Sequence, residues 1–198
     1  MSADKNPTRS TFVVLVGFCA VLAIVIAGGF WWVTRSNDAL AGETLDAFPT
    51  LDRSTLSQSQ GELLATLEKE WESGAPGTTY AEGVEESWCA DFVSWNMNKI
   101  GMPYSNPNSG SWRIPGVYTL QEYYESVGTF VPLGQDYRLK TGDTILYDDS
   151  SPFGQHVNIV LRNDAGIVTT VGGNENNSVM LHRFNPDDVA GIVGFGSF

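Results

Sequence analysis

The stretch Glu86-Ser87-Trp88-Cys89-Ala90-Asp91-Phe92-Val93 decides the fold and the chemistry of this chain. It opens a predicted helix that has Ser87 as its N-cap and stops at Gly101. Apolar residues recur through Ile100 at spacings of three and four, which gives this helix one buried face. Cys89 then falls in the first turn, where the helix dipole and the free backbone N–H groups favour a thiolate.

The chain has two cysteines, and only Cys89 lies beyond a hydrophobic N-terminal segment. Cys19 is read as a small apolar residue within that segment. If the rest of the chain is exported, Cys89 has no disulfide partner in its own domain. A single cysteine in an exported domain is typical of a linkage point or a reactive thiol.

Two further residues follow Cys89 in the order that a thiol hydrolase needs. His156 begins a β-type run after a Pro-Phe-Gly turn, so its imidazole can take the thiol proton and later protonate a leaving amine. Asn174 follows Gly172-Gly173 and is predicted to fix the imidazole tautomer. Glu175 is the weaker candidate for this third role, because neighbours on a strand point to opposite faces. The predicted catalytic residues are therefore Cys89, His156 and Asn174.

The order of helical and strand patterns predicts an α+β domain. Helical spacing is found over residues 61–73 and 117–127, besides the helix that begins near Cys89. After Gly128 the pattern changes to short runs rich in β-branched and aromatic residues. These runs cover residues 144–147, 157–162, 167–171, 178–184 and 192–195. Helices followed by such runs favour N-terminal helices packed on an antiparallel sheet.

Residues 11–33 form an almost unbroken apolar run, long enough to cross a bilayer as a transmembrane signal anchor. Lys5 and Arg9 precede it, so residues 1–10 are expected to be cytoplasmic and the C-terminal domain extracytoplasmic. The alternative is a cleaved signal peptide, with Ala39-Leu40-Ala41 as the cleavage site. Residues 34–60 are interpreted as a linker and residues 61–198 as the folded domain.

Charge and composition exclude several kinds of partner. Beyond residue 35 the chain carries 8 basic and 22 acidic side chains, which argues against nucleic acid as a partner. Two histidines and one domain cysteine offer no ligand spacing for a metal, so neither a metal nor another cofactor is expected. Of these two histidines, His182 alternates with apolar residues and is interpreted as structural.

Four segments in this order resemble the CHAP family (cysteine, histidine-dependent amidohydrolase/peptidase) within the NlpC-like, papain-like hydrolases. They are Trp88–Val93, the Lys140-x-Gly142-Asp143 turn, Gln155–Val160, and Gly172-Gly173-Asn174. The resemblance covers roughly residues 62–198. It implies a papain-like fold, cleavage of amide bonds in peptidoglycan, and the roles of nucleophile, base and polar third member for Cys89, His156 and Asn174.

One departure from this family leaves two functions open. Many CHAP enzymes have a Glu two residues before the Asn, where this chain has Gly172. The first expectation is a membrane-anchored peptidoglycan hydrolase, either an endopeptidase or an N-acetylmuramoyl-L-alanine amidase, acting on stem peptides. The alternative is a catalytically inactive domain that binds wall peptides or a partner protein at the envelope.

Overall fold

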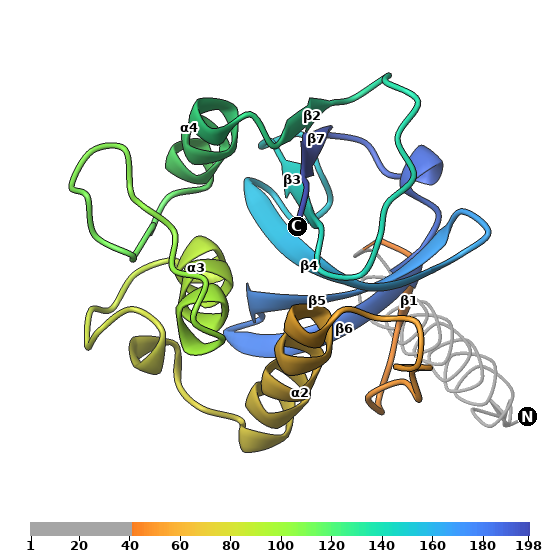
Figure 1. Ribbon diagram of the computed structural model, residues 1–198, viewed down its shortest axis with the longest axis horizontal. Helices are drawn as coiled ribbons and strands as arrows, with labels where there is room; N and C mark the ends of the chain where they lie inside the picture. Colours follow the sequence, from red (N-terminus) through yellow and green to blue (C-terminus); the bar gives the residue numbers. More distant parts are fainter. Residues whose placement is uncertain (1–40) are drawn as a thin grey trace, which may run out of the picture. The chain divides into compact units, whose positions relative to one another are not determined.

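An antiparallel sheet forms the centre of the computed structural model, which describes residues 41–198 (Figure 1). Within these residues seven strands are ordered β1-β6-β5-β4-β3-β7-β2. Their bounds are β1 Glu43–Thr44, β2 Phe130–Pro132, β3 Thr144–Tyr147, β4 His156–Asp164, β5 Ile167–Glu175, β6 Ser178–Phe184 and β7 Ile192–Gly196. The prediction of an α+β domain with an antiparallel sheet is confirmed.

Three α-helices of the described part pack around this sheet: α2 (Gln58–Ser73), α3 (Cys89–Lys99) and α4 (Val117–Val127). Figure 1 shows α2 and α3 beside the sheet region formed by β4, β5 and β6, and α4 beside β2, β3 and β7. Short 3₁₀ turns cover Gly77–Thr79 and Pro186–Asp188. The helix predicted over residues 117–127 has these bounds in the structure, and α2 begins a few residues before its predicted start.

The start of α2 has a local cause in the sequence. Ser57 accepts a hydrogen bond from the backbone N–H of Gln60, and the Gln60 side chain accepts one in return from the backbone N–H of Ser57. This capping box satisfies two of the N–H groups that a helix start leaves free. Gly74 ends the helix with φ +58°, a left-handed conformation that glycine adopts at little cost.

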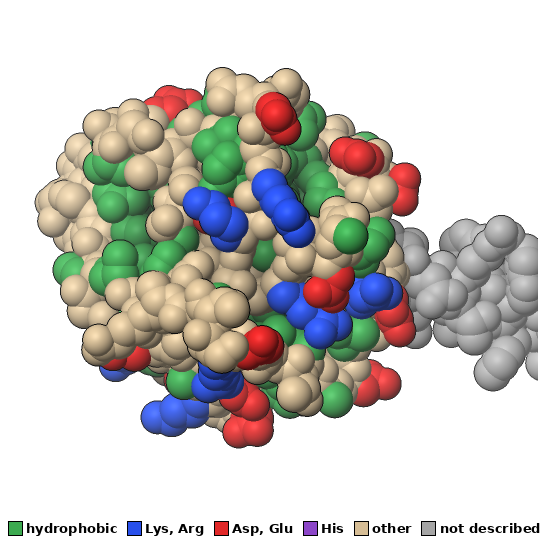
Figure 2. Space-filling model, turned by 45° about the vertical axis from the view of Figure 1, so that its right-hand side comes forward, with side chains coloured by type: hydrophobic (Ala, Val, Ile, Leu, Met, Phe, Trp, Pro, Cys, Tyr) green, Lys and Arg blue, Asp and Glu red, His purple; other side chains and the backbone are tan. Residues whose placement is uncertain are grey.

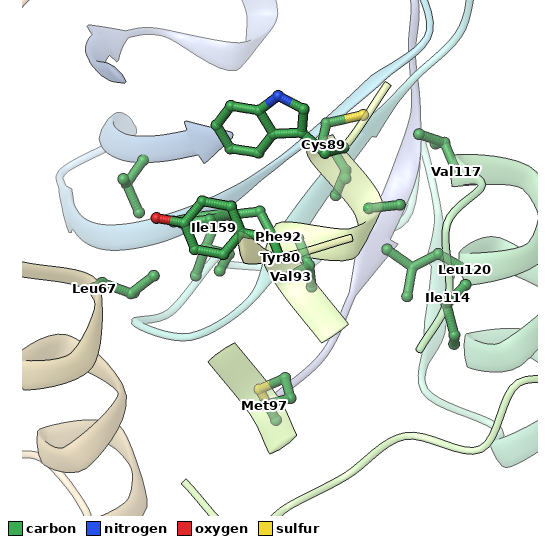
Figure 3. Close-up of a cluster of buried hydrophobic side chains, with 14 of the residues drawn as sticks. Leu67, Tyr80, Cys89, Phe92, Val93, Met97, Ile114, Val117, Leu120 and Ile159 are labelled. Carbon is green, nitrogen blue, oxygen red and sulfur yellow. The ribbon is translucent and has the colours of Figure 1, made fainter. Parts of the chain in front are cut away.

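The helices and the sheet share one apolar core. Val157, Ile159 and Leu161 alternate along β4 and are buried in the same cluster as the inner face of α3. Figure 3 shows part of this cluster, with Phe92, Val93 and Met97 of α3 in view. Since side chains alternate along a strand, His156 and Asn158 belong to the other face of β4.

Two glycines let Trp88 settle at the start of α3. A Cβ added at Gly77 would lie 2.2 Å from Trp88 Nε1, and one at Gly173 would lie 2.6 Å from both Trp88 Cζ3 and Phe92 Cβ. Real Cβ atoms do not approach so closely, so both positions are restricted to glycine by packing. Gly173 therefore allows β5 and the first turn of α3 to come into close contact, which places Cys89 beside the sheet.

The described part of the predicted linker is packed against the domain. Residues 43–44 pair with β6, and Leu45, Phe48, Leu51 and Leu56 pack against the core. Phe48 lies against Trp71 of α2 with ring centroids 6.1 Å apart. These widely spaced apolar residues give no clear period, and the sequence analysis therefore assigned them to a linker. Strands β1 and β2 were not predicted either.

The expected membrane anchor lies outside the described residues. Residues 1–10, the apolar run 11–33 and the first part of the linker all precede residue 41. From residue 41 onward, no helix combines the length and the hydropathy that a bilayer crossing requires.

Candidate active site

Cys89 is the first residue of α3, in the first turn as the sequence predicted. Its N-cap is Trp88 rather than Ser87, and no side chain hydrogen-bonds the free N–H groups of this helix start. The residue is only 5% exposed. Figure 3 shows the Cys89 side chain at the upper margin of the labelled cluster. The thiol therefore lies at the margin of the core, beside a helix start that has no side-chain cap.

His156 is the first residue of β4 and lies against Cys89. Hydrogen bonding and charge from the Cys89 side chain contribute to the raised pKa of the imidazole. The Nε2 atom of His156 is 3.0 Å from Oε1 of Glu175. Since Nε2 faces the carboxylate, Nδ1 is the nitrogen left to face the thiol. The structure thus brings together the cysteine and the histidine that the sequence predicted.

The residue on the far side of the imidazole is Glu175. The sequence predicts Asn174 in this position, but the described residues contain no hydrogen bond between Asn174 and His156. Glu175 is 4% exposed, and its Oε1 also accepts a hydrogen bond of 3.3 Å from Asn158 Nδ2. The geometry therefore favours the candidate that the sequence analysis had ranked lower.

A β-bulge explains why the side chains at the end of β5 depart from simple alternation. The register between β5 and β6 shifts between Gly172 and Glu175. Asn174 has φ +64°, and Asn176 and Asn177 are also left-handed, with φ +49° and +58°. A left-handed residue inside a strand interrupts the two-residue alternation, so Glu175 can turn toward the face that carries His156.

The carboxylate fills the space beside the glycine at the family's usual Glu position. A Cβ built on Gly172 would lie 2.0 Å from Oε1 of Glu175 and 3.0 Å from Nε2 of His156. A side chain at residue 172 would therefore collide with the carboxylate that now holds the imidazole. Residue 172, where many CHAP enzymes have a Glu, is glycine in this chain. Glu175 supplies a carboxylate in the space beside it.

His156 and Glu175 stabilise each other's charged forms. Burial disfavours the charged imidazole, but the hydrogen bonds and charges of Cys89 and Glu175 outweigh burial and raise the pKa of His156 to about 9. Burial also disfavours the carboxylate, but hydrogen bonds and charges from His156 and His182 outweigh it and lower the pKa of Glu175 to about 2. At neutral pH the site therefore holds an imidazolium beside the Glu175 carboxylate.

Aromatic and ionic contacts enclose this centre. The ring of Phe153 stacks on His156 with centroids 5.2 Å apart. On α3, the buried carboxylate of Asp91 accepts a hydrogen bond of 2.8 Å from Arg113 Nε, and Arg113 also pairs with Glu86. This ion-pair network ties the loop before α4 to the helix that carries Cys89.

The face in Figure 2 carries mixed charge, and the described residues contain no metal-binding group. On the face drawn in Figure 2, acidic and basic side chains are interspersed and no histidine is visible, in keeping with the burial of both histidines. In residues 41–198 no group of three His, Cys, Asp or Glu side chains is arranged to hold a metal ion.

Sequence reasoning missed two polar partners of Glu175. Asn158 on β4 and His182 on β6 both reach the carboxylate. The signal for Asn158 was its two-residue spacing from His156, which places both on one face of the strand. For His182 the sequence offered no such signal, because its contact depends on the bulge that redirects Glu175.

Comparisons with known proteins agree with this geometry. Residues 79–174 match the family model described as CHAP domain. The matched segment includes Cys89 and His156 and ends at Asn174, just before the carboxylate that contacts the imidazole. The predicted resemblance to this family is thereby confirmed. Neither the curated proteins nor the solved structures contained a match.

Proposed function

We propose that this chain, which matches the CHAP domain family over residues 79–174, hydrolyses an amide bond in peptidoglycan through the Cys89 thiolate. CHAP domains are generally amidohydrolases or peptidases, and the family suggests peptidoglycan as the substrate. The observation that carries the proposal is the chain of contacts Cys89–His156–Glu175. It supplies a nucleophile, a proton carrier and a group that stabilises the positive imidazole.

The acylation step follows from this arrangement. The thiolate of Cys89 attacks the carbonyl carbon of the amide, and the oxygen of that carbonyl gains negative charge. Free N–H groups in the first turn of α3 are suited to stabilise this oxyanion. His156 then donates its proton to the amide nitrogen, which leaves as an amine while the acyl group stays on sulfur as a thioester.

The deacylation step returns the site to its starting state. Neutral His156 takes a proton from water, and the resulting hydroxide attacks the thioester carbon. The carbon–sulfur bond breaks, a carboxylic acid leaves, and the thiolate again faces an imidazolium. Through both steps Glu175 stays ionised, because its pKa is about 2, and it offsets the charge of the protonated ring.

The inactive-domain alternative rested on the absence of a carboxylate at Gly172. Glu175 lies 3.0 Å from His156 Nε2 and offers that carboxylate from another position. This contact favours hydrolysis over a purely binding role. A domain that only binds wall peptides or a partner protein does not need a buried thiol, imidazole and carboxylate that contact one another in that order.

Digestion of purified peptidoglycan by the purified full-length chain tests the proposal. Mass spectrometry of the released muropeptides should show new cleavage products, and their masses distinguish an endopeptidase from an N-acetylmuramoyl-L-alanine amidase. Cys89→Ser should abolish the products, whereas Cys19→Ser is the matched control and should retain them. Unchanged muropeptides with the unmodified chain, or full activity in Cys89→Ser, would contradict the proposal.

We also propose that residues 11–33 anchor the protein in the membrane with the domain outside, which would place the site near the wall. The support is the length of the apolar run and the basic residues before it. Protease added to intact cells should remove the domain and spare the N-terminus. A soluble form that begins at Gly42 would instead show cleavage after Ala41.

A further inference from the structure

His182 is fully buried on β6, beside the centre described above. It is 0% exposed, and its backbone pairs with Thr170 of β5 and Thr44 of β1. Its ring meets Phe153 edge to face, with centroids 5.3 Å apart. Phe153 also stacks on His156, so one aromatic ring covers both histidines. Burial of an imidazole without a polar partner costs free energy, so the groups that His182 contacts matter for its role.

The partner of His182 is the second oxygen of Glu175. Nε2 of His182 lies 2.5 Å from Oε2, whereas His156 and Asn158 both use Oε1. This close contact does not have hydrogen-bond geometry, and neither Nε2 of His182 nor Oε2 of Glu175 has a hydrogen-bond partner among the described residues. A proton on Nε2 therefore relieves the burial of both atoms at once.

The tautomer of His182 follows from its other nitrogen. Nδ1 is buried and has no polar partner in the described part of the chain. An N–H donor without an acceptor is costly to bury, and a lone pair is the form that Nδ1 can adopt there. The geometry thus favours the tautomer with its proton on Nε2, the nitrogen that contacts Glu175.

We propose that His182 is a positioning residue that holds the second oxygen of Glu175, so that the first oxygen stays on His156. This inference deepens the hydrolase function proposed above and rests on it. The carboxylate contacts His156 on β4 and His182 on β6. Glu175 itself is the last residue of β5, next to a bulge. Without the contact between His182 and Oε2, the carboxylate is free to rotate away from the His156 imidazole.

Among the described residues, His182 makes the one polar contact with Oε2 of Glu175. The titratable groups that face the carboxylate are His156 on β4, His182 on β6 and Tyr147 on β3, whose pKa is raised by burial and by the charge of Glu175. The Tyr147 hydroxyl has no hydrogen-bond partner among the described residues. Loss of His182 should therefore leave Oε2 without a donor and reduce the support for the His156 imidazolium.

Two substitutions in the full-length chain separate positioning from packing. His182→Leu fills the space with an apolar side chain and removes the N–H donor. His182→Gln keeps an N–H donor near the position of Nε2. Cys89 reactivity with iodoacetamide is measured across pH, with mass spectrometry used to separate the Cys89 and Cys19 peptides. Titration of His156 is followed by NMR, and muropeptide release gives kcat and KM.

A positioning role predicts a specific pattern. His182→Leu should lower the pH at which His156 loses its proton and reduce kcat on the order of 10-fold with little change in KM. His182→Gln should restore most of both. If a folded His182→Leu variant keeps the His156 titration and the Cys89 pH profile of the unmodified chain, His182 is only structural and the proposal fails.

The proposal can also be decided without a variant, should His182→Leu not fold. NMR of the ring nitrogens in the unmodified chain reports the His182 tautomer directly. A proton on Nε2 is expected, and a proton on Nδ1 alone would overturn the proposal. If the chain releases no muropeptides but the His156 titration still depends on His182, then the hydrolase function fails while the positioning role stands.

Discussion

Glu175 shows how much one side chain decides at this site. Its carboxylate is buried and yet ionised, because His156, Asn158 and His182 surround its two oxygens. A buried carboxylate without such partners would favour its protonated form. The stabilised negative charge is what keeps the imidazole of His156 protonated beside the Cys89 thiol.

Glu175→Gln should therefore cost far more activity than Asn174→Ala. The amide keeps the size of the side chain but lacks the charge that supports the imidazolium, so we expect kcat to fall on the order of 100-fold. Asn174→Ala removes a side chain with no contact to His156 and should cost much less. Rates of muropeptide release measure both effects.

A matched control is available at another buried glutamate. Glu70 on α2 is 6% exposed and accepts a hydrogen bond of 3.2 Å from the Tyr80 hydroxyl, and it makes no hydrogen bond or ion pair with His156. Glu70→Gln should leave the rate of muropeptide release near that of the unmodified chain. If Asn174→Ala proved more harmful than Glu175→Gln, Asn174 would be the third member of the site, as the sequence first indicated.

At the scale of single elements, the bulge at the end of β5 has the greatest effect on the site. Gly172 does not have a positive φ, so its need for glycine arises from the space that Glu175 occupies rather than from backbone strain. Glycine at residue 172 and glutamate at residue 175 act as one unit, because the first leaves the room that the second fills.

Gly172→Ala should disrupt this unit. The new Cβ would lie 2.0 Å from Glu175 Oε1, so the carboxylate must move off the imidazole. We expect lost activity together with a stability cost of about 1–3 kcal/mol, as for other overpacked sites. Urea unfolding and muropeptide release measure the two. Gly61→Ala on α2, where no atom lies within 4 Å, is the control and should not destabilise.

The elements differ in how well the sequence predicted them. Residues 117–127 and 178–184 were predicted with the bounds that the structure has, because each carries a clear period between turn residues. The bulge was not predictable from alternation, since it depends on the left-handed conformation of Asn174. Asparagine tolerates that conformation better than most residues, and this tolerance was the available signal.

At the scale of the whole molecule, the segment before α2 belongs to the fold. Phe48 contacts Trp71, and β1 extends the sheet beyond β6. The sequence predicts that the domain starts at residue 61, because isolated apolar residues among polar ones are typical of a linker. These residues are partly buried only through contacts with elements such as α2 and β6, which follow them in the sequence.

Phe48→Ala should therefore destabilise the domain, by about 1–3 kcal/mol in urea unfolding, which is the usual range for a contact of this kind. Leu133→Ala is a suitable control, because Leu133 is 58% exposed and its loss should change stability by less than about 0.5 kcal/mol. Equal stabilities for Phe48→Ala and the unmodified chain would mean that the segment only rests on the surface.

Stability should also depend on pH in a way that identifies the Glu175 cluster. The folded state lowers the pKa of Glu175 from 4.5 to about 2, because the hydrogen bonds and charges of His156 and His182 outweigh its burial. A lowered pKa contributes stability that is fully present above about pH 4.5 and is lost as the pH falls toward 2.

Comparison of two variants isolates this contribution from the titration of the other carboxylates. The free energy of unfolding should differ most between the unmodified chain and Glu175→Gln near pH 5, and the difference should shrink as the pH falls to about 2. Asn174→Ala has lost no titratable group, so its difference from the unmodified chain should stay constant over the same range. Urea unfolding at a series of pH values measures both. A Glu175→Gln difference that does not change with pH would mean that the carboxylate is not held ionised by its two histidines.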